Sequence, residues 1–383
     1  MSTRWIRIAP GRRSLTFLVG GLLFLVLDFG AKSLDRWLRP PPAPQTHLSI
    51  RVAHPEYDHG IRPNAVGTES YGSQRAEYFS NSLGLRDEKI RDVPLCSNVP
   101  RFLFMGDSMT EAGPVSWNQT FVGRLQDRWH GRTEVLNGAV ADFGPVLILP
   151  KLKDLLDEKG LQVDQVVIVL NPSVLRTSFT YVPSQGGKIE HHPYGPYHGQ
   201  ASFFARTDKL ESWLEANVEK KFVLLGALVR NARLSYRKIH PLTRSMDRFK
   251  FWVEQGFSAD PEEQRLILEG TRRTLESLDQ IHEFLASKKV ALGVVFLPWP
   301  KTLASLNPPP LPERLDTWAK ERGVTYLNLL PLFLSEGSPE EVVARYYLKN
   351  DNHLTEAGHE RVATWLADPR NGLFPVRRQI PPK

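Results

Sequence analysis

The sequence predicts an α/β fold around a mostly parallel sheet, preceded by one transmembrane helix, and three observations lead to this prediction. From residue 101 onward, short β-rich runs alternate with amphipathic helical stretches, as in a parallel α/β sandwich. Three of those runs, FLFM, VVIVL and ALGVVFL, are almost continuously apolar, which is typical of strands covered on both faces. Near the start, residues 15–27 form the uncharged run LTFLVGGLLFLVL, which is typical of a membrane-spanning segment.

The composition limits the class of protein. The chain has 383 residues, of which 41% are hydrophobic and 24% charged, and these proportions exclude a disordered chain, a collagen and a multi-pass membrane protein. The length allows two domains or one α/β domain with insertions. The single cysteine, Cys96, excludes an intrachain disulfide. The net charge of +7 is spread along the chain rather than gathered into a stripe, so no nucleic-acid partner is expected.

Residues 14–31 are predicted to form an uncleaved signal anchor. As a helix they reach about 27 Å, close to the roughly 30 Å of a bilayer's hydrocarbon core. The residues before them, 1–13, are basic: Arg4, Arg7, Arg12 and Arg13. The positive-inside rule therefore places 1–13 in the cytoplasm and the bulk of the chain outside. A cleaved signal peptide shares this pattern and is the alternative, although no A-x-A site follows.

Composition divides the rest of the chain further. Residues 32–47 contain the proline-dense stretch RPPPAP and are predicted to form an extended spacer. Residues 48–99 lead into a main domain at 100–368, and 369–383 form a basic tail. Within the main domain, about 180–260 is an expected insertion that covers the site or packs beside it, because this stretch is loop-like, aromatic and basic.

The strands and helices of the main domain can be located individually. The strand candidates are 101–105, 134–137, 165–170, 290–297 and 324–329. Apolar residues at spacings of three, four and seven predict a helix over 261–288. Thr355 can cap another helix, in which Val362, Trp365 and Leu366 form a buried stripe.

The first of these strands ends in Gly106-Asp107-Ser108. A serine at a strand-to-helix turn exposes its hydroxyl at the carboxyl edge of the sheet, with its own N–H at the positive end of the following helix, and this placement suits a nucleophile. Thr110 stands where a G-x-S-x-G elbow has its second glycine, which disfavours the α/β-hydrolase arrangement. Asp107 and Glu111 are assigned no catalytic role, because serine chemistry needs no further carboxylate beside the nucleophile.

A base for Ser108 is predicted near the other end of the chain. His353 precedes the helix capped by Thr355, and Asp351 can accept its ring N–H, which leaves the other ring nitrogen to take the serine proton. His359 is the competing base, but it falls inside the predicted helix. The histidines of the HHPYGPYHG loop, His191, His192 and His198, have no acidic cluster nearby, so no metal is expected there.

Together, the early Gly106-Asp107-Ser108 and the late Asp351-x-His353 resemble the SGNH/GDSL hydrolases. The resemblance implies a flavodoxin-like three-layer α/β/α sandwich, a catalytic serine and histidine, and an oxyanion hole built by glycine and asparagine. It extends over most of the chain, from about His54 to Trp365. Segments that look like those of membrane-anchored or secreted bacterial members are His54–Tyr57, Pro63-Asn64, Asn81–Asp87 and Leu297–Pro300. Trp299 in the last of these either lines a substrate cleft or packs in the core.

The two oxyanion blocks depart from the family pattern. In the second block, VLNGAVADFG at 135–144, the expected glycine is replaced by Asp142, and Gly144 lies two residues later. Either backbone N–H is a candidate donor, together with that of Ser108. In the third block, Asn171 is the side-chain donor that the resemblance favours. An alternative register places Ser173 there instead, and Asn171 then starts a turn before Pro172.

The preferred hypothesis is a serine ester hydrolase or acyl transferase that acts on O-acyl esters. The resemblance suggests acetylated cell-envelope carbohydrate as substrate, and a single-pass protein of the bacterial inner membrane with its catalytic domain on the periplasmic or extracellular side. No cofactor is expected, because neither G-x-G-x-x-G nor G-x-x-x-x-G-K-[ST] occurs at a strand-to-helix turn. The alternative is a catalytically degenerate, membrane-tethered binding or assembly protein of the same fold.

Overall fold

The structure is a computed structural model that describes residues 23–24, 26–31, 50–71, 74–192, 213–214, 217–218, 221–222, 224–239, 261–305 and 310–374. By the contacts within it, the chain divides into two compact units. One comprises 1–46 with 199–248, and the other comprises 47–198 with 249–383. All the candidate site residues belong to the second unit.

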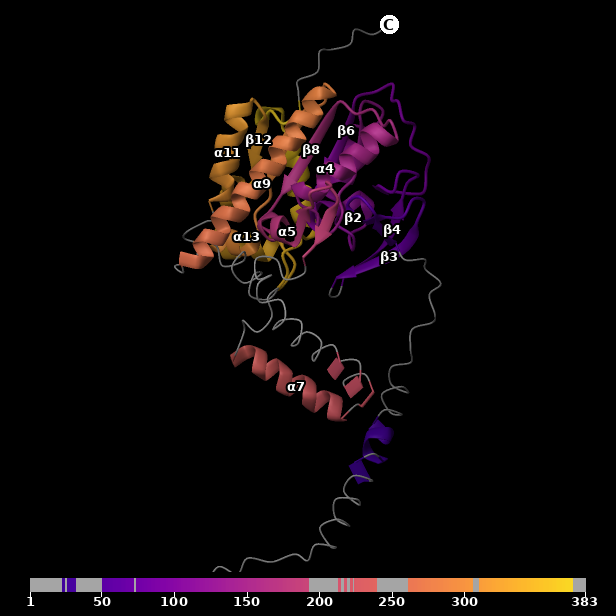
Figure 1. Ribbon diagram of the computed structural model, residues 1–383, viewed down its shortest axis with the longest axis vertical. Coiled ribbons are helices and arrows are strands. Elements are labelled where there is room, and N and C mark those ends of the chain that lie inside the picture. The colour runs from indigo at the N-terminus through magenta and orange to yellow at the C-terminus, as the bar shows by residue number, and fades with distance from the viewer. Residues whose placement is uncertain are drawn as a thin grey trace, which may run out of the picture. The chain divides into compact units, whose positions relative to one another are not determined.

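The second unit is built on an eight-stranded sheet in the order β12-β11-β8-β6-β7-β5-β4-β3 (Figure 1). Its parallel strands are β6 (Arg101–Met105), β7 (Glu134–Asn137), β8 (Gln165–Leu170), β11 (Ala291–Phe296) and β12 (Thr325–Asn328). Numbered among themselves, these strands run 2-1-3-4-5, the order of flavodoxin-like sheets. The mostly parallel sheet is therefore confirmed, with the last two strands one residue shorter at each end than predicted.

Helices cover this parallel sheet on both faces. They include α3 (Phe121–Arg128), α4 (Pro145–Lys153), α5 (Ser173–Thr180), α9 (Pro261–Ser287), α11 (Leu311–Arg322) and α14 (Glu356–Ala367). In Figure 1, α4, α5, α9 and α11 lie on one face, where α9 packs against the other three. Crossover connections are right-handed and the strand order reverses at β6, so α3 lies on the opposite face, packed on α14.

Further elements complete the second unit. They are α2 (Ser108–Glu111), α10 (Pro300–Ala304), α12 (Leu330–Leu334), α13 (Pro339–Tyr346), three turns of other helix types (Trp117–Gln119, Asp154–Glu158 and Pro369–Asn371) and the hairpin of β9 (Tyr181–Pro183) with β10 (Ile189–His191). This hairpin begins the expected insertion at 180–260. Most of the remainder of that stretch, like most of the tail at 369–383, lies outside the described residues.

The lead-in at 48–99 extends the main sheet. After a separate hairpin of β1 (Arg51–His54) and β2 (Asp58–Ile61), the strands β3 (Val66–Tyr71), β4 (Gln74–Ser80) and β5 (Arg86–Asp87) add to the edge of β7 in antiparallel fashion. This extension is absent from the sequence prediction.

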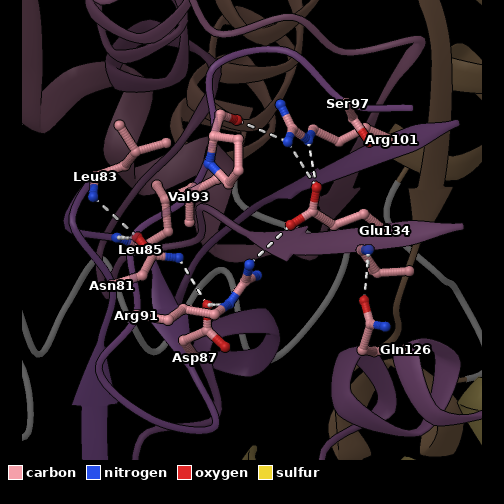
Figure 2. Close-up of polar contacts among 12 residues, drawn as sticks. Asn81, Leu83, Leu85, Asp87, Arg91, Val93, Ser97, Arg101, Gln126 and Glu134 are labelled. Atoms are coloured by element: carbon pink, nitrogen blue, oxygen red, sulfur yellow. Dashed lines mark hydrogen bonds and ion pairs between the residues drawn. The ribbon is translucent and has the colours of Figure 1, made fainter. Parts of the chain in front are cut away.

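Figure 2 shows how the Asn81–Asp87 motif fixes the lead-in to the sheet. The Asn81 side chain accepts the N–H groups of Leu83 and Leu85 and donates to Asp87 at 2.8 Å. Arg91 then bridges Asp87, at 2.8 Å, to Glu134 on β7, at 2.9 Å. The motif therefore has a structural role, as a turn whose side chains tie the lead-in to β7.

The other unit contains α7 (Leu224–Ile239) and the predicted anchor at 14–31. Residues 23–24 and 26–31 of the anchor are helical. Among the described residues, no helix combines the length and the apolarity needed to cross a membrane. The rest of the span predicted at 14–31, and all of 1–13 and 32–47, lie outside the described residues.

Candidate active site

Ser108 lies where β6 ends and α2 begins, as predicted. The turn requires glycine at position 106, because a Cβ atom there would come within 2.6 Å of Thr110 Oγ1 and 2.9 Å of the Val169 carbonyl oxygen. Asp107 caps α2, with its Oδ1 accepting the Met109 N–H at 3.0 Å. The site thus stands at the carboxyl edge of the sheet, between β6 and β8, where the strand order reverses and open α/β sheets bind their ligands.

The structure brings Ser108, His353 and Asp351 into one hydrogen-bonded row. Ser108 Oγ lies 2.9 Å from His353 Nε2, and His353 Nδ1 lies 2.6 Å from Asp351 Oδ1. The same carboxylate oxygen accepts the backbone N–H of His353 at 3.0 Å. Partial burial would raise the pKa of Asp351, but these hydrogen bonds from His353 outweigh it and the pKa lies below its ordinary value. Asp351 is therefore ionised at neutral pH and orients the imidazole.

His359 lies in the core rather than at the surface. Its side chain is only 2% exposed, its ring stacks on Phe121, and Nδ1 accepts the Phe121 N–H at 3.3 Å. Burial lowers the pKa of His359 to about 3. It is therefore a neutral core histidine whose Nδ1 is engaged with the backbone, and His353 alone of the two contacts Ser108.

The second block begins on β7, and its part from the end of that strand onward is here called the 137–144 loop. Asp142 has a φ of +64°, the left-handed conformation that glycine adopts without steric cost. Its carboxylate forms an ion pair with Arg176 and is largely exposed, so it is turned away from the core. Gly144 caps α4, and a Cβ atom there would come within 2.0 Å of Thr177 Oγ1, so close packing accounts for this glycine.

Asn171 and Ser173, the two registers considered for the third block, both contact Asp107. Asn171 Nδ2 and Ser173 Oγ each donate to Asp107 Oδ2 at 2.8 Å, while Asn171 Oδ1 accepts the Ser173 N–H at 2.9 Å. Among the described residues, the second N–H of the Asn171 amide has no acceptor and is a candidate donor to a ligand, whereas the Ser173 hydroxyl donates its only proton to Asp107. Burial raises the pKa of Asp107, against the effect of these hydrogen bonds.

Two carboxylates that the sequence analysis left without a role hold the site together. Asp107 joins the ends of β6 and β8. Glu111, which is 1% exposed, accepts the Ala141 N–H at 2.6 Å, the Tyr78 hydroxyl at 2.8 Å and the Arg51 guanidinium at 2.6 Å. It therefore links the helix that begins at Ser108 to the 137–144 loop and to the lead-in. In the sequence Glu111 is only an acidic residue one turn after the serine, and nothing near it indicates that it is buried.

Further side chains stabilise the same region. Lys151 is buried and donates to the Gly138 carbonyl at 2.9 Å, and burial lowers its pKa to about 7. Arg86 of the Asn81–Asp87 motif is 1% exposed and donates to the Glu111 and Val115 carbonyls, directly after α2. The 137–144 loop and the segment from Glu111 to Val115 are thus held by side chains outside the catalytic row.

The remaining candidates take no part in the row. Trp299 is 8% exposed, and its indole N–H has no acceptor in the part of the chain that the structure describes. His191 stacks on Tyr181, and His192 lies near Glu190. Among the described residues no cluster of three His, Cys, Asp or Glu side chains could hold a metal ion, and His198 lies outside them.

No protein-family model matches the chain, and no curated protein matches it. Solved structures do match. LAE5, an α/β hydrolase enzyme from the metagenome of Lake Arreo, Spain, is 14% identical over 73% of this chain and 98% of its own, with a TM-score of 0.38.

Two further matches are similarly distant. Axe2, an acetylxylan esterase from Geobacillus stearothermophilus, is 12% identical over 74% of this chain and 97% of its own, with a TM-score of 0.37. A member of the lipolytic protein G-D-S-L family from Veillonella parvula is 10% identical over 70% and 96%, with a TM-score of 0.36. The matched proteins are thus described as a hydrolase, an esterase and a lipolytic protein, and likeness at this level assigns this chain neither a family nor an activity.

Proposed function

We propose that the chain is an SGNH/GDSL-type ester hydrolase with Ser108 as nucleophile, His353 as general base and Asp351 as the residue that orients the base. The observation that carries the proposal is the row of contacts at 2.9 Å and 2.6 Å from Ser108 through His353 to Asp351. Ser108 and His353 lie 245 positions apart in the sequence, yet Ser108 Oγ faces His353 Nε2 at hydrogen-bond distance. A degenerate binding protein has no need to keep this arrangement.

In the proposed reaction, Ser108 Oγ attacks the acyl carbonyl while His353 Nε2 takes its proton. His353 then returns the proton to the leaving alkoxide, and a water or an acceptor hydroxyl releases the acyl group from Ser108 by the same steps in reverse. Asp351 stabilises the imidazolium that forms between these transfers.

Three donors are proposed for the oxyanion: the N–H of Ser108, the N–H of Asp142 and Nδ2 of Asn171. Within the described part of the chain, no acceptor takes the N–H of Ser108 or of Asp142. Asp142 is preferred to Gly144 because its left-handed backbone supplies the conformation expected of the family's glycine. Losing one such donor raises the barrier by about 2.7–4 kcal/mol.

The decisive test is hydrolysis of p-nitrophenyl acetate and longer acyl esters by the full chain in detergent. We expect turnover by the wild type and loss to background in Ser108→Ala and His353→Ala. Ser287→Ala, at an exposed helix end, is the matched control and keeps full activity. If the folded wild type is inert on every ester while an acyl acceptor is also supplied, the proposal is wrong and the binding or assembly protein becomes the better hypothesis.

We further propose acetylated cell-envelope carbohydrate as substrate and a single-pass anchor at 14–31, with the catalytic domain periplasmic or extracellular. These proposals rest on the run at 15–27, the basic residues before it and the resemblance to anchored bacterial members. Resistance of the membrane-bound chain to carbonate extraction, together with its N-terminal sequence, separates an anchor from a cleaved signal peptide. Acetate release from O-acetylated polysaccharide tests the substrate class.

A further inference from the structure

The carbonyl of Ala141 is held by a side chain from the distant lead-in. His59 Nε2, on β2, lies 2.8 Å from the Ala141 carbonyl oxygen, and His59 Nδ1 lies 2.8 Å from Asp58 Oδ2. A carbonyl oxygen can only accept a hydrogen bond, so the Nε2 that faces it is the donor. The His59 ring also packs edge-on against Phe143, which lies in the same loop as Ala141, at 5.2 Å between centroids.

This contact determines where the Asp142 N–H points. The Ala141 carbonyl and the Asp142 N–H belong to one peptide unit, and no described peptide bond is cis. In a trans peptide the two groups point in opposite directions. Because His59 takes the carbonyl on one side, the Asp142 N–H is directed to the other side, away from the lead-in.

The neighbouring peptide is fixed as well. Glu111 accepts the Ala141 N–H at 2.6 Å, and the Val140 N–H donates to the Gly106 carbonyl at 3.1 Å, beside the Ser108 turn. Glycine adopts the left-handed conformation without a steric cost, whereas Asp142 adopts it as an L-residue and pays one. Glu111, which accepts the Ala141 N–H, and His59, which binds the Ala141 carbonyl, therefore hold the backbone on the N-terminal side of Asp142.

We propose that His59 is a positioning residue for ester hydrolysis: by donating from Nε2 to the Ala141 carbonyl, it aims the Asp142 N–H at the oxyanion. The inference rests on the proposed function. It assigns part of the catalytic machinery to the lead-in at 48–99, which supplies no residue to the row of Ser108, His353 and Asp351.

Three variants of the full chain test this. His59→Gln can still donate to the carbonyl from its terminal amide, whereas His59→Asn is too short and His59→Leu has no donor. We expect kcat to fall about 10- to 100-fold in the Asn and Leu variants, below the 10²–10³ of complete donor loss, with KM within about twofold. His59→Gln keeps kcat within about fivefold of wild type. His54→Gln, on the other strand of the hairpin, is the control and is unchanged.

Each outcome has a clear meaning. Equal activity in all variants overturns the inference, and so does an equal loss in Gln, Asn and Leu, which indicates a structural role alone. A rise in KM at constant kcat also overturns it. If His59→Leu fails to fold by circular dichroism, the comparison of Gln with Asn decides. An inert wild type instead defeats the proposed function, and the inference with it.

Discussion

Asn171 Nδ2 donates a hydrogen bond of 2.8 Å to Asp107 Oδ2, so the residue before Ser108 is joined to the residue that follows β8. Asp107 thereby sets the spacing between two proposed oxyanion donors, the Ser108 N–H and the remaining Asn171 amide proton. The carboxylate is 6% exposed and also accepts Ser173 Oγ and the Met109 N–H. Both carboxylate oxygens of Asp107 accept hydrogen bonds. An asparagine amide has only one acceptor oxygen and cannot accept all of them.

Asp107→Asn is therefore expected to lower kcat. An amide in place of the carboxylate brings an N–H against Asn171 and Ser173 or against Met109, and a hydrogen bond to a buried charge is worth about 1.5–3 kcal/mol. If that loss falls on the transition state, kcat decreases about 10- to 100-fold. Ester hydrolysis with parallel thermal melts measures it. Asp92→Asn on the surface is the control, and a kcat within twofold of wild type in Asp107→Asn would contradict this role.

Asp351→Asn is expected to retain the fold and lose activity. The amide no longer selects the tautomer that presents a free Nε2 to Ser108, so kcat should fall by about 10²- to 10⁴-fold at neutral pH. The pKa of Asp351 lies below its ordinary 3.8, so its carboxylate stays ionised as the pH falls to about 4. The negative charge is lost only at a pH below that value.

The pH profile supplies the second readout for Asp351. Protonation of Asp351 itself should add no activity loss between pH 5 and 8. A fall in activity steeper than a single proton allows in that range would show that Asp351 titrates higher than its contacts with His353 indicate. Asp316→Asn, on the exposed face of α11, should leave the profile unchanged.

Asp142→Gly is expected to keep activity and to be as stable as wild type or slightly more so. Glycine removes a left-handed cost of about 1–2 kcal/mol for an L-residue. It also removes the largely exposed ion pair to Arg176, worth about 0–1 kcal/mol. The N–H is unchanged, so kcat should stay within about threefold.

Asn64→Gly provides the matched control for Asp142→Gly. Asn64 has a φ of +53° in the lead-in, with no contact to the row, so its replacement should change stability alone. Urea unfolding and ester hydrolysis of both variants measure the comparison. A tenfold loss of kcat in Asp142→Gly would mean that the carboxylate, rather than the peptide, acts in the site.

His359→Gln is expected to reduce the acid sensitivity of folding. The pKa of buried His359 is lowered from 6.5 to about 3, so the unfolded chain binds a proton that the folded chain does not between these values. Stability from this group is complete above pH 6.5 and is lost as the pH falls toward 3, by up to about 1.4 kcal/mol per pH unit. Glutamine can still accept the Phe121 N–H but does not titrate.

Urea unfolding at pH 7 and pH 5 measures the difference. The wild type should lose about 2 kcal/mol more than His359→Gln between these conditions. His130→Gln in the exposed turn after α3 is the control and should behave as wild type. Equal losses in wild type and His359→Gln would mean that His359 is protonated in the folded chain.

The parallel strands were predictable because strands buried on both faces have almost no polar residues. β6, β7 and β8 begin and end at the predicted residues. The strands of the lead-in were not predicted, because they contain many polar residues. β4 (QRAEYFS) has charged residues on its outer face and only an alternating apolar pattern, and its place in the sheet depends on β5 meeting β7 about fifty residues later.

The candidate site shows the same division. Ser108, Asp351 and His353 could be named from local motifs because the chemistry requires those residue types next to a turn or a helix start. The contacts of His59, Glu111 and Asp107 join residues 30 to 82 positions apart, and no local pattern marks them. The burial of His359 is likewise a tertiary effect, set by its packing on Phe121.

The attachment of β5 to β7 also bears on synthesis. Residues 51–87 leave the ribosome before β7, yet β5 has only β4 to pair with until Glu134–Asn137 has emerged. During that interval the nascent chain exposes an unpaired strand edge, a surface prone to wrong association. A fragment that starts at residue 100 lacks β5 and would leave the edge of β7 permanently unpaired. Recombinant versions of the domain should therefore begin before Arg51.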